Sequence, residues 1–212
     1  QYLEYCVTRE NAPASWLPPK DRKIHIGRKA ANTKSQKKHP LTDQEILTLI
    51  EDLQTTEAGS RWGNALKLLT VYGLRPVELT HLHVRKTPKG EKYLWCSYEK
   101  RSGGGITKPR RLEPLPIENT DWKLLALLDA KLIELPKLSA EGNGVAEQIR
   151  KYLERRKAWT SLKERVKARN EELGTYSFRH SYSVRGHKLG IDSGSMSSAM
   201  GHSLEVHCRE YP

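Results

Sequence analysis

The closing stretch of the chain contains the most specific pattern of the sequence: Thr175-Tyr-Ser-Phe-Arg-His-Ser-Tyr-Ser-Val-Arg-Gly-His187 and then Met200-Gly-His-Ser-Leu-Glu-Val-His-Cys-Arg-Glu-Tyr211. Arg179 precedes His202 by 23 residues, and His202 precedes Tyr211 by nine. These residues are an anion binder, a hydrogen-bond donor and a potential nucleophile. Because a guanidinium group can hold two phosphate oxygens at once, the set suits a phosphodiester better than a carbonyl.

The composition of the chain indicates an anionic partner. Among 212 residues, 37 are Lys or Arg and 25 are Asp or Glu, which gives a formal net charge of +12 and a pI near 9.6. A basic excess of this size is typical of proteins that bind nucleic acid. A soluble protein with a basic surface is the simpler alternative. No apolar run approaches the roughly 18 residues of a membrane-spanning helix.

Three cysteines, Cys6, Cys96 and Cys208, are odd in number, far apart and without a Cys-x-x-Cys pair. We therefore expect no disulfide framework and a reducing compartment such as the cytoplasm. The chain begins with Gln1 rather than methionine, which predicts that it is a piece of a longer protein. Its length allows one domain together with a fragment of another.

A domain boundary is expected near residue 40. Residues 1–39 combine a short helix, a proline-containing segment and a basic stretch. That stretch is either a flexible linker lying along a phosphate backbone or a disordered tail. Residues 40–212 begin with Thr42 and Glu45 at the spacing of a helix capping box.

The apolar periodicity of residues 40–212 predicts a mainly α domain with a small antiparallel β-sheet, an α+β fold. Helices are expected over residues 42–53, 59–72, 121–135 and 146–173. Strands are expected over residues 93–98 and 111–115.

The segment Gly73-Leu-Arg-Pro-Val-Glu-Leu79 joins two predicted helices. Its glycine can end the first helix, and Pro76 suits the first turn of the second. Arg75 thus stands at a helix start, where Glu78 can supply its counter-charge. The pair is either purely structural or holds the arginine rigid so that its other donors reach a ligand.

A glycine-rich hairpin is expected at residues 99–110, between the two strands. It is either an ordinary solvated turn or a flexible arm that presents a lysine to a phosphate. The Gly-x-x-x-x-Gly-Lys-Ser/Thr and Gly-x-Gly-x-x-Gly nucleotide-binding patterns are absent from the sequence. Four cations lie on the hairpin: Lys100, Arg101, Lys108 and Arg110.

Together these motifs resemble the catalytic domain of the tyrosine recombinases, the phage-integrase family. Four boxes carry the resemblance, which covers about residues 41–212: Gly73–Leu79, Phe178-Arg-His180, Met200-Gly-His202 and Tyr211. Any one box alone is a weak signal, whereas their order and the nine-residue spacing to Tyr211 are specific. The resemblance implies that residues 1–39 are the end of a core-binding domain followed by the interdomain linker.

The resemblance implies a role for each matched residue. Arg75 and Arg179 resemble the two arginines that clamp the scissile phosphate, and Glu78 resembles the acid that supports the first. His202 resembles the histidine that hydrogen-bonds a non-bridging oxygen, and Tyr211 resembles the nucleophile.

Two lysines and a histidine also match the family pattern, whereas Tyr176 departs from it. Lys100 resembles the lysine that protonates the leaving 5′-oxygen, and Lys108 is its rival because glycine hairpins slide easily in an alignment. His180 resembles a histidine with a structural role. Tyr176 stands where the family usually has histidine. A phenol with a pKa near ~10 rarely accepts a proton at neutral pH, although it can donate a hydrogen bond to phosphate. The proton of Tyr211 must then go to water, to the phosphate or to another side chain.

The implied function is site-specific DNA recombination or integration through a 3′-phosphotyrosine, without a cofactor. The implied assembly is a homotetramer on double-stranded DNA and a monomer or weak oligomer without it, in a nucleoid-associated, prokaryotic or phage-encoded setting. Further DNA contacts are expected at Lys37, Lys38, Arg101, Lys108 and Arg110. Because the family usually adds a last helix beyond this point, Tyr211 is expected to be poorly fixed.

Three alternatives remain open at this point. A type IB topoisomerase would use similar chemistry to relax DNA. A DNA-binding module of the same fold would have weakened or lost the chemistry. A metal site would use the remaining cluster of imidazoles and a thiol, but its spacings fit no standard zinc pattern: His180, His187, His202, His207 and Cys208.

Overall fold

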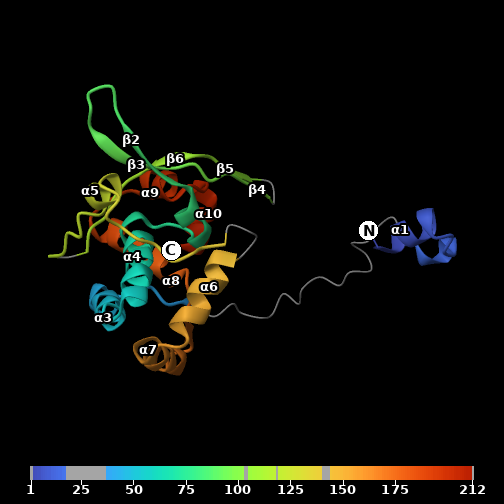
Figure 1. Cartoon of the computed structure of the whole chain (residues 1–212), viewed down its shortest axis with the longest axis horizontal. Coiled ribbons are helices and arrows are strands. Elements are labelled where there is room, and N and C mark those ends of the chain that lie inside the picture. Colours follow the sequence, from blue (N-terminus) through green and yellow to red (C-terminus); the bar gives the residue numbers. More distant parts are fainter. Residues whose placement is uncertain (1, 18–36, 103–104, 118, 140–143, 212) are drawn as a thin grey trace. The chain divides into compact units, whose positions relative to one another are not determined.

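The computed structural model describes residues 2–17, 37–102, 105–117, 119–139 and 144–211. The chain divides into two compact units, Gln1–Gln36 and Lys37–Pro212. In the first unit, α1 (Tyr2–Arg9) precedes a 3-10 turn, η1 (Ala14–Trp16) (Figure 1). Among the described residues, none of the helices combines the length and the apolar character that a membrane span requires.

The second unit is mainly helical with a small antiparallel sheet, which confirms the predicted α+β class (Figure 1). Its described α-helices are α3 (Asp43–Leu53), α4 (Glu57–Tyr72), α5 (Leu124–Asp129), α6 (Gly144–Leu153), α7 (Lys157–Ala168), α8 (Ser177–Lys188), α9 (Ser193–Met200) and α10 (Leu204–Glu210). The predicted capping box starts α3. Thr42 Oγ1 accepts from the Glu45 amide at 3.2 Å, and the Glu45 carboxylate accepts from the Thr42 amide at 2.9 Å.

The antiparallel sheet has the strand order β2-β3-β6 and follows a short 3-10 helix, η2 (Pro76–His81). Its strands are β2 (Leu82–Lys86), β3 (Lys92–Cys96) and β6 (Arg110–Leu112). Leu94 pairs with Leu112 and Leu82 pairs with Cys96, so apolar side chains of one face are in register. Two smaller pairs are the hairpin of β4 (Lys100–Ser102) with β5 (Gly105–Thr107) and the parallel pair of β1 (Lys37–Lys38) with β7 (Glu171–Glu172).

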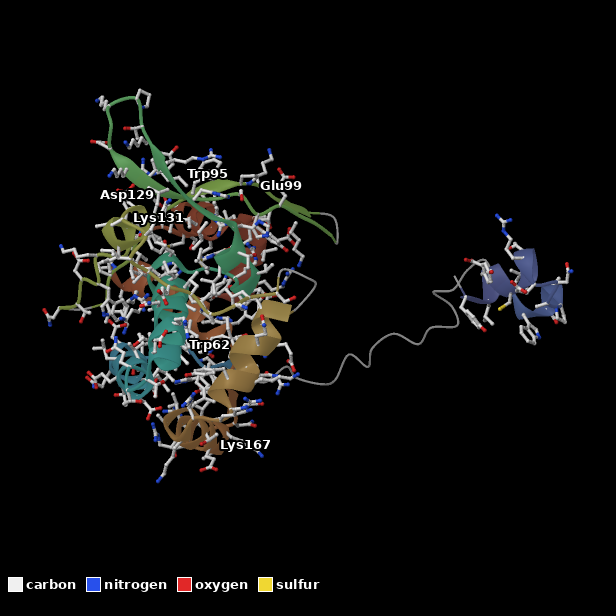
Figure 2. The ribbon with its side chains drawn as sticks, in the orientation of Figure 1. Trp62, Trp95, Glu99, Asp129, Lys131 and Lys167 are labelled. Carbon is white, nitrogen blue, oxygen red and sulfur yellow. The ribbon has the colours of Figure 1, made fainter. Side chains whose placement is uncertain are left out.

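Helix α4 lies at the centre of the hydrophobic core, and α3 and α8 pack against it. Leu66, Leu68 and Leu69 of α4 are no more than 1% exposed. Trp62 of α4, which is labelled in Figure 2, lies in this core region. It stacks on Tyr152 of α6 with 4.5 Å between the ring centroids. Each buried leucine contributes roughly 1.5–3 kcal/mol. The row of leucines therefore anchors the helix whose C-terminus leads into the candidate site.

The prediction of one long helix over residues 146–173 is wrong, because the chain turns between α6 and α7. Leu153 and Trp159 are six residues apart, a spacing that places them on different faces of a continuous helix. Both are buried, at 1% and 2% exposure, because each helix presents its own stripe to the core. After α7, Asn170 takes a φ of 59°, and the chain continues into β7.

One further helix and one strand also differ from the sequence prediction. The helix expected over residues 121–135 covers only Leu124–Asp129. Lys131 beyond it takes a φ of 56°, and Leu132 is 69% exposed, so that leucine does not extend the buried face. Strand β2 escapes prediction because its five residues follow η2 directly, without a turn signal.

The basic stretch that the sequence places in a linker enters the second unit earlier than expected. Lys37 and Lys38 pair in parallel with Glu171 and Glu172, and the Lys38 ammonium forms an ion pair with the Glu172 carboxylate. His39 is 7% exposed, and its Nδ1 lies 3.0 Å from Glu171 Oε2. The acidic pair of β7 therefore fixes Lys38 on the second unit.

Candidate active site

The end of α4 places Arg75 at the start of η2, as the sequence predicts. Gly73 caps α4 with a φ of 59°, and a Cβ there would lie 2.5 Å from the Tyr182 ring, so the turn requires glycine. The Arg75 side chain is 14% exposed. Its Nη1 donates to Glu78 Oε1 at 2.8 Å and its Nη2 donates to Gly201 O at 2.9 Å. One guanidinium group thus connects η2 to the loop after α9.

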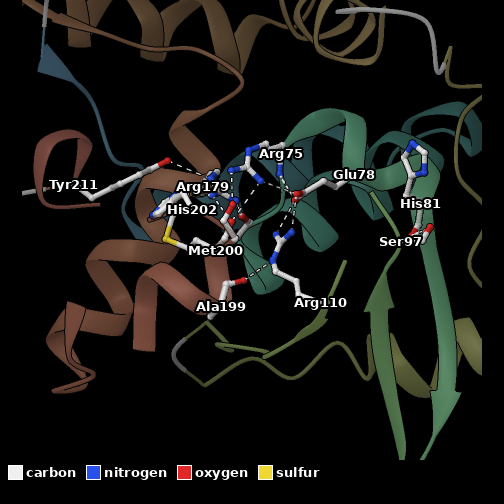
Figure 3. Close-up of polar contacts among 12 residues, drawn as sticks. Arg75, Glu78, His81, Ser97, Arg110, Arg179, Ala199, Met200, His202 and Tyr211 are labelled. Atoms are coloured by element: carbon white, nitrogen blue, oxygen red, sulfur yellow. Dashed lines mark hydrogen bonds and ion pairs between the residues drawn. The ribbon is translucent and has the colours of Figure 1, made fainter. Parts of the chain in front are cut away.

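Glu78 is fully buried and holds two arginines in place (Figure 3). It accepts from the Arg75 amide at 2.9 Å, and its two oxygens accept from Nη1 and Nη2 of Arg110 at 2.9 and 3.0 Å. Burial alone would raise the pKa of this carboxyl, but hydrogen bonds and charge from Arg110, with the charges of Arg179 and Arg75, lower the pKa to about 2. Glu78 is therefore ionised at neutral pH.

The position of Arg110 differs from the DNA contact expected from the sequence. The residue is 9% exposed, and besides its pair with Glu78 its Nε donates to Ala199 O at 2.8 Å. The register of β6 against Cys96 turns the side chain inward. Gly201 leaves it room, because a Cβ there would lie 2.7 Å from the guanidinium. Arg110 orients Glu78 from inside the fold.

Arg179 of α8 is 1% exposed and uses all three of its nitrogens (Figure 3). Nη1 donates to Gly73 O at 2.5 Å, Nη2 donates to Met200 O at 2.6 Å, and Nε donates to the Tyr211 hydroxyl at 3.1 Å. Nη2 also lies 3.0 Å from His202 Nδ1. Burial lowers the pKa of this guanidinium, which nonetheless stays ionised at neutral pH.

Tyr211 lies with its hydroxyl on Arg179, and among the described residues no hydrogen bond joins it to Arg75, so the expectation that it is poorly fixed stays a prediction. The Tyr211 amide donates to His207 O at 2.8 Å, which continues the path of α10 to the tyrosine. The centroid of its ring lies 4.6 Å from that of His180 and 5.3 Å from that of His202. The backbone bond and the flanking imidazoles together orient the phenol toward the arginine.

Two of the three imidazoles beside Tyr211, those of His202 and His180, are neutral at pH 7. Burial lowers the pKa of His202 to about 3, and the charges of Arg179 and Arg75 act in the same direction. Burial, followed by the charge of Arg179, lowers the pKa of His180 to about 4. Each ring therefore offers one N–H and one lone pair.

Tyr176 is the N-cap residue of α8, three positions before Arg179, and is 44% exposed. Partial burial raises the pKa of its phenol above the ordinary value, although the charges of Arg75 and Arg179 oppose this shift. The phenol therefore stays protonated at neutral pH and is a poor proton acceptor. Its hydroxyl remains suited to donate a hydrogen bond.

One cleft of 790 Å³ brings together residues from Lys38 to Tyr211, which lie 211 − 38 = 173 positions apart in the sequence. Six residues with predicted catalytic roles line it: Arg75, Lys100, Tyr176, Arg179, His202 and Tyr211. Lys100 comes from the β4–β5 hairpin, whereas Lys108 is exposed beyond β5. This placement favours Lys100 over Lys108 for the leaving-group role. The Arg101 side chain lies outside the described part of the structure.

Arg75 and Arg179, which line the cleft, belong to a cluster that carries excess positive charge. Three guanidinium groups, those of Arg75, Arg110 and Arg179, surround the single carboxylate of Glu78, which leaves 3 − 1 = 2 positive charges. Partly desolvated positive charges favour an anion that accepts several hydrogen bonds. The described residues include no group of three or more His, Cys, Asp or Glu side chains that could hold a metal ion.

Sequence reasoning missed the roles of Arg110 and of two histidines. His207 is fully buried, with its Nδ1 3.0 Å from His202 Nε2 and its Nε2 2.9 Å from His187 Nε2. The contact between His202 and His207 could have been suspected from their five-residue spacing, because the second histidine then lies on the short helix α10. The contact with His187 depends on how α8 packs against α10.

Comparison with solved structures assigns the fold. The Tn1549 transposon integrase in complex with circular intermediate DNA matches with a TM-score of 0.50 and 15% identity, over 84% of this chain and 64% of that chain. XerH recombinase bound to a palindromic difH substrate matches with a TM-score of 0.56 and 18% identity, over 85% and 51%. XerA recombinase matches with a TM-score of 0.50 and 14% identity, over 100% and 76%. The fold is that of a tyrosine recombinase catalytic domain.

The similarity to recombinases is one of fold. No protein-family model and no curated protein sequence matches this chain. The chain spans less than two thirds (64%) of the solved Tn1549 integrase chain and about half of the XerH chain. Any catalytic role of the cleft described above must therefore be argued from the geometry of this chain's own residues.

Proposed function

We propose that this protein is a DNA strand transferase that cleaves and rejoins double-stranded DNA through a 3′-phosphotyrosine at Tyr211. The observation that carries the proposal is the 3.1 Å bond between the Tyr211 hydroxyl and Arg179 Nε, in a cleft that Arg75, Lys100 and His202 also line. Positioned arginines beside a tyrosine suit a nucleophile held against the phosphate that it attacks. Structures of the same fold include an integrase and a recombinase bound to DNA.

In the proposed reaction, the Tyr211 oxygen bonds to phosphorus while the bond from phosphorus to the 5′-oxygen breaks. Tyr211 loses its proton, and Lys100 gives one to the departing 5′-oxygen. Negative charge grows on the non-bridging oxygens, where Arg75 and Arg179 donate from positions that Glu78 and backbone carbonyls already fix. The phosphotyrosine retains the bond energy, so a DNA 5′-hydroxyl can rejoin the strand without a nucleotide.

The biological role that follows is site-specific recombination or integration. Exchange between two duplexes requires four strand cleavages, so we infer a homotetramer on DNA and a monomer or weak oligomer without it. The first unit would be the end of a core-binding domain, which is supported by the match of XerA over the whole of this chain. Such a protein would work on DNA in the cytoplasm, associated with the nucleoid of a prokaryote.

Covalent trapping on DNA tests the proposal. The substrates are nicked duplexes from the DNA that flanks the coding sequence, in which the short 5′-hydroxyl product diffuses away after cleavage. We expect the protein to form an adduct that survives denaturing electrophoresis and Tyr211→Phe to form none. Arg179→Lys keeps the positive charge but loses the bidentate hydrogen bonding of a guanidinium group. This variant is expected to bind DNA but to cleave it at least ~100-fold more slowly than the unaltered protein.

The outcomes separate this function from its alternatives. An adduct formed by Tyr211→Phe would show that the nucleophile is a different residue. DNA binding without any adduct would favour a DNA-binding module that lacks the chemistry, an alternative that Tyr176 makes relevant. Relaxation of supercoiled DNA by the monomer would instead indicate a type IB topoisomerase.

A further inference from the structure

A chain of three histidines leads from the cleft to the surface of the second unit. His202 Nε2 lies 3.0 Å from His207 Nδ1, and His207 Nε2 lies 2.9 Å from His187 Nε2. His187 Nδ1 lies 3.3 Å from Ile191 O. His207 is fully buried, whereas His187 is exposed. The imidazoles therefore connect a half-buried position in the cleft, beside Tyr211, to the surface at His187.

The two ends of this chain fix where each imidazole carries its proton. Arg179 has only donors, so His202 Nδ1 accepts from it and the His202 proton lies on Nε2. His202 then donates to His207 Nδ1, and His207 donates from Nε2 to His187 Nε2. The His187 proton lies on Nδ1 and is donated to Ile191 O. All four hydrogen bonds run in one direction, from the cleft to the surface.

The protonation of the inner rings suits proton transfer. Burial lowers the pKa of His202, and the charges of Arg179, Arg75 and Arg110 act in the same direction. Burial also lowers the pKa of His207, where His187 and Arg179 add to the shift. Each ring therefore holds one proton at neutral pH. A neutral ring that gains a proton at one nitrogen can release the proton of the other nitrogen to its neighbour.

The first acceptor of the chain lies beside the proposed nucleophile. The Tyr211 hydroxyl and His202 Nδ1 bind to Nε and Nη2 of the same Arg179 guanidinium. Their rings stack with 5.3 Å between centroids and 18° between planes. The neighbouring Tyr176 phenol stays protonated at neutral pH, so the lone pair of His202 is the better proton acceptor.

We propose that His202, His207 and His187 relay the phenolic proton of Tyr211 to solvent, a proposal that rests on the function proposed above. When a phosphate draws the Arg179 Nη2–H away from His202 Nδ1, the lone pair of that nitrogen is released. As the Tyr211 oxygen bonds to phosphorus, its proton goes to His202 Nδ1. The proton on His202 Nε2 moves to His207 Nδ1, the proton on His207 Nε2 moves to His187 Nε2, and the proton on His187 Nδ1 goes to water. One proton leaves the protein for each cleavage, and no charge remains on the relay.

The relay also changes what His202 presents to the phosphate. Before cleavage its Nδ1 is an acceptor, and after the transfer Nδ1 carries a proton that can be donated to a phosphate oxygen. Rejoining of the strand requires Tyr211 to regain a proton as the leaving group, and the same chain then runs inward. His202 is the residue that exchanges the proton, while His207 and His187 act through it as positioning residues.

The tautomers give a test on the free protein that does not depend on activity. Nitrogen-15 NMR of the histidines is expected to show protons on Nε2 of His202 and His207 and on Nδ1 of His187. A proton on His202 Nδ1 in the free protein would reverse the direction of the chain and overturn the proposal.

Cleavage kinetics test the transfer itself. His207→Gln keeps one acceptor and one donor, so it can bridge His202 and His187 without passing a proton. We expect its adduct formation on the nicked duplex to slow by about 100-fold, with DNA binding and the unfolding midpoint unchanged. A purely structural role predicts that this variant cleaves at the rate of the unaltered protein, and that result would refute the relay.

The surface end of the relay offers a variant with little risk to folding. His187→Ala exposes His207 Nε2, and imidazole added to the buffer is expected to restore cleavage toward the original rate. His83→Ala removes an exposed histidine of β2 as the matched control and should change neither the rate nor its response to imidazole. If His187→Ala cleaves at the full rate without imidazole, the relay is wrong while the proposed function stands. If the unaltered protein forms no adduct, the proposed function fails first.

Discussion

Replacement of Glu78 by glutamine is expected to destabilise the protein by about 3 kcal/mol at pH 7. The buried carboxyl accepts from Arg75 and Arg110, and its pKa is about 2 against an ordinary value of 4.5. The difference of 4.5 − 2 = 2.5, at 1.36 kcal/mol per pKa unit, corresponds to about 3 kcal/mol. An independent comparison agrees, because removal of one partner of a buried ion pair costs about 3–5 kcal/mol.

The pH dependence of this stabilisation has a definite sign. Because the pKa of Glu78 is lower in the folded state, the stabilisation is fully present above pH 4.5 and is lost as the pH falls toward 2. The free energies of unfolding of the two proteins should therefore differ by about 3 kcal/mol at pH 7 and converge in acid. The other carboxylates titrate in both proteins, so the difference isolates Glu78.

Urea unfolding between pH 7 and pH 2.5 measures this difference. Glu172→Gln is the matched control, because Glu172 pairs with Lys38 at the surface, where its side chain is 49% exposed. Surface ion pairs contribute about 0–1 kcal/mol, so the control should remain close to the unaltered protein. A Glu78→Gln difference below about 1 kcal/mol at pH 7, or one that does not shrink in acid, would show that the carboxylate does not hold the arginines as described.

Three further substitutions, one of them with a matched control, test the chemistry and the frame of the site. Lys100→Ala should slow cleavage by about 10²–10⁴-fold. A substrate with sulfur in place of the leaving 5′-oxygen should restore the rate, because a thiolate leaves without a proton. If cleavage of the sulfur substrate stays slow, the general acid is a residue other than Lys100. Gly73→Ala should lower the free energy of unfolding in urea by about 2–4 kcal/mol, because φ is 59° there and the added Cβ would lie 2.5 Å from Tyr182. Gly90→Ala is the control, and with a φ of 85° and open space around it should lower this free energy by about 1–2 kcal/mol. Equal losses at the two glycines would contradict the close approach of the Tyr182 ring. Tyr176→His should accelerate adduct formation at pH 7 by supplying a second proton acceptor, and an unchanged rate would show that proton removal does not limit cleavage.

The local frame of the site could be predicted from the sequence because short-range rules decide it. Gly73 ends α4 in the left-handed region, and Pro76 starts η2 one residue after Arg75, so the arginine and Glu78 occupy the same turn whatever the rest of the fold does. The eight residues between His202 and Tyr211 likewise contain one short helix, α10.

The role of Arg110 could not be predicted, because strand register decides it. Arg110 and Arg111 are adjacent and equally basic, yet the first is 9% exposed and bonded to Glu78, while the second is exposed. A shift of one residue in the pairing of β6 with β3 would exchange the two side chains. Composition makes every arginine of a basic hairpin a candidate DNA contact, and only the tertiary structure selects the one that supports the site.

The chain of three histidines also could not be predicted from the sequence spacing alone. His187 and His207 lie 20 residues apart on different helices, and their contact depends on the packing of those helices. From the sequence, the same residues indicate at most a metal site with poor spacing. Their bond directions become evident only when Arg179 is seen to donate at one end and Ile191 O to accept at the other.

The arginines that would hold a phosphate also determine the acid–base chemistry around Tyr211. After burial itself, the charges of Arg179 and Arg75 help to lower the pKa of His202 to about 3, which keeps its Nδ1 lone pair free of a proton. A phosphodiester bound to these arginines would offset part of their charge, and a nearby negative charge raises the pKa of an imidazole. His202 would thus become a stronger base when the phosphate is in place. In the proposed mechanism, proton acceptance would then be coupled to substrate binding, and Tyr211 would be activated without a histidine at position 176.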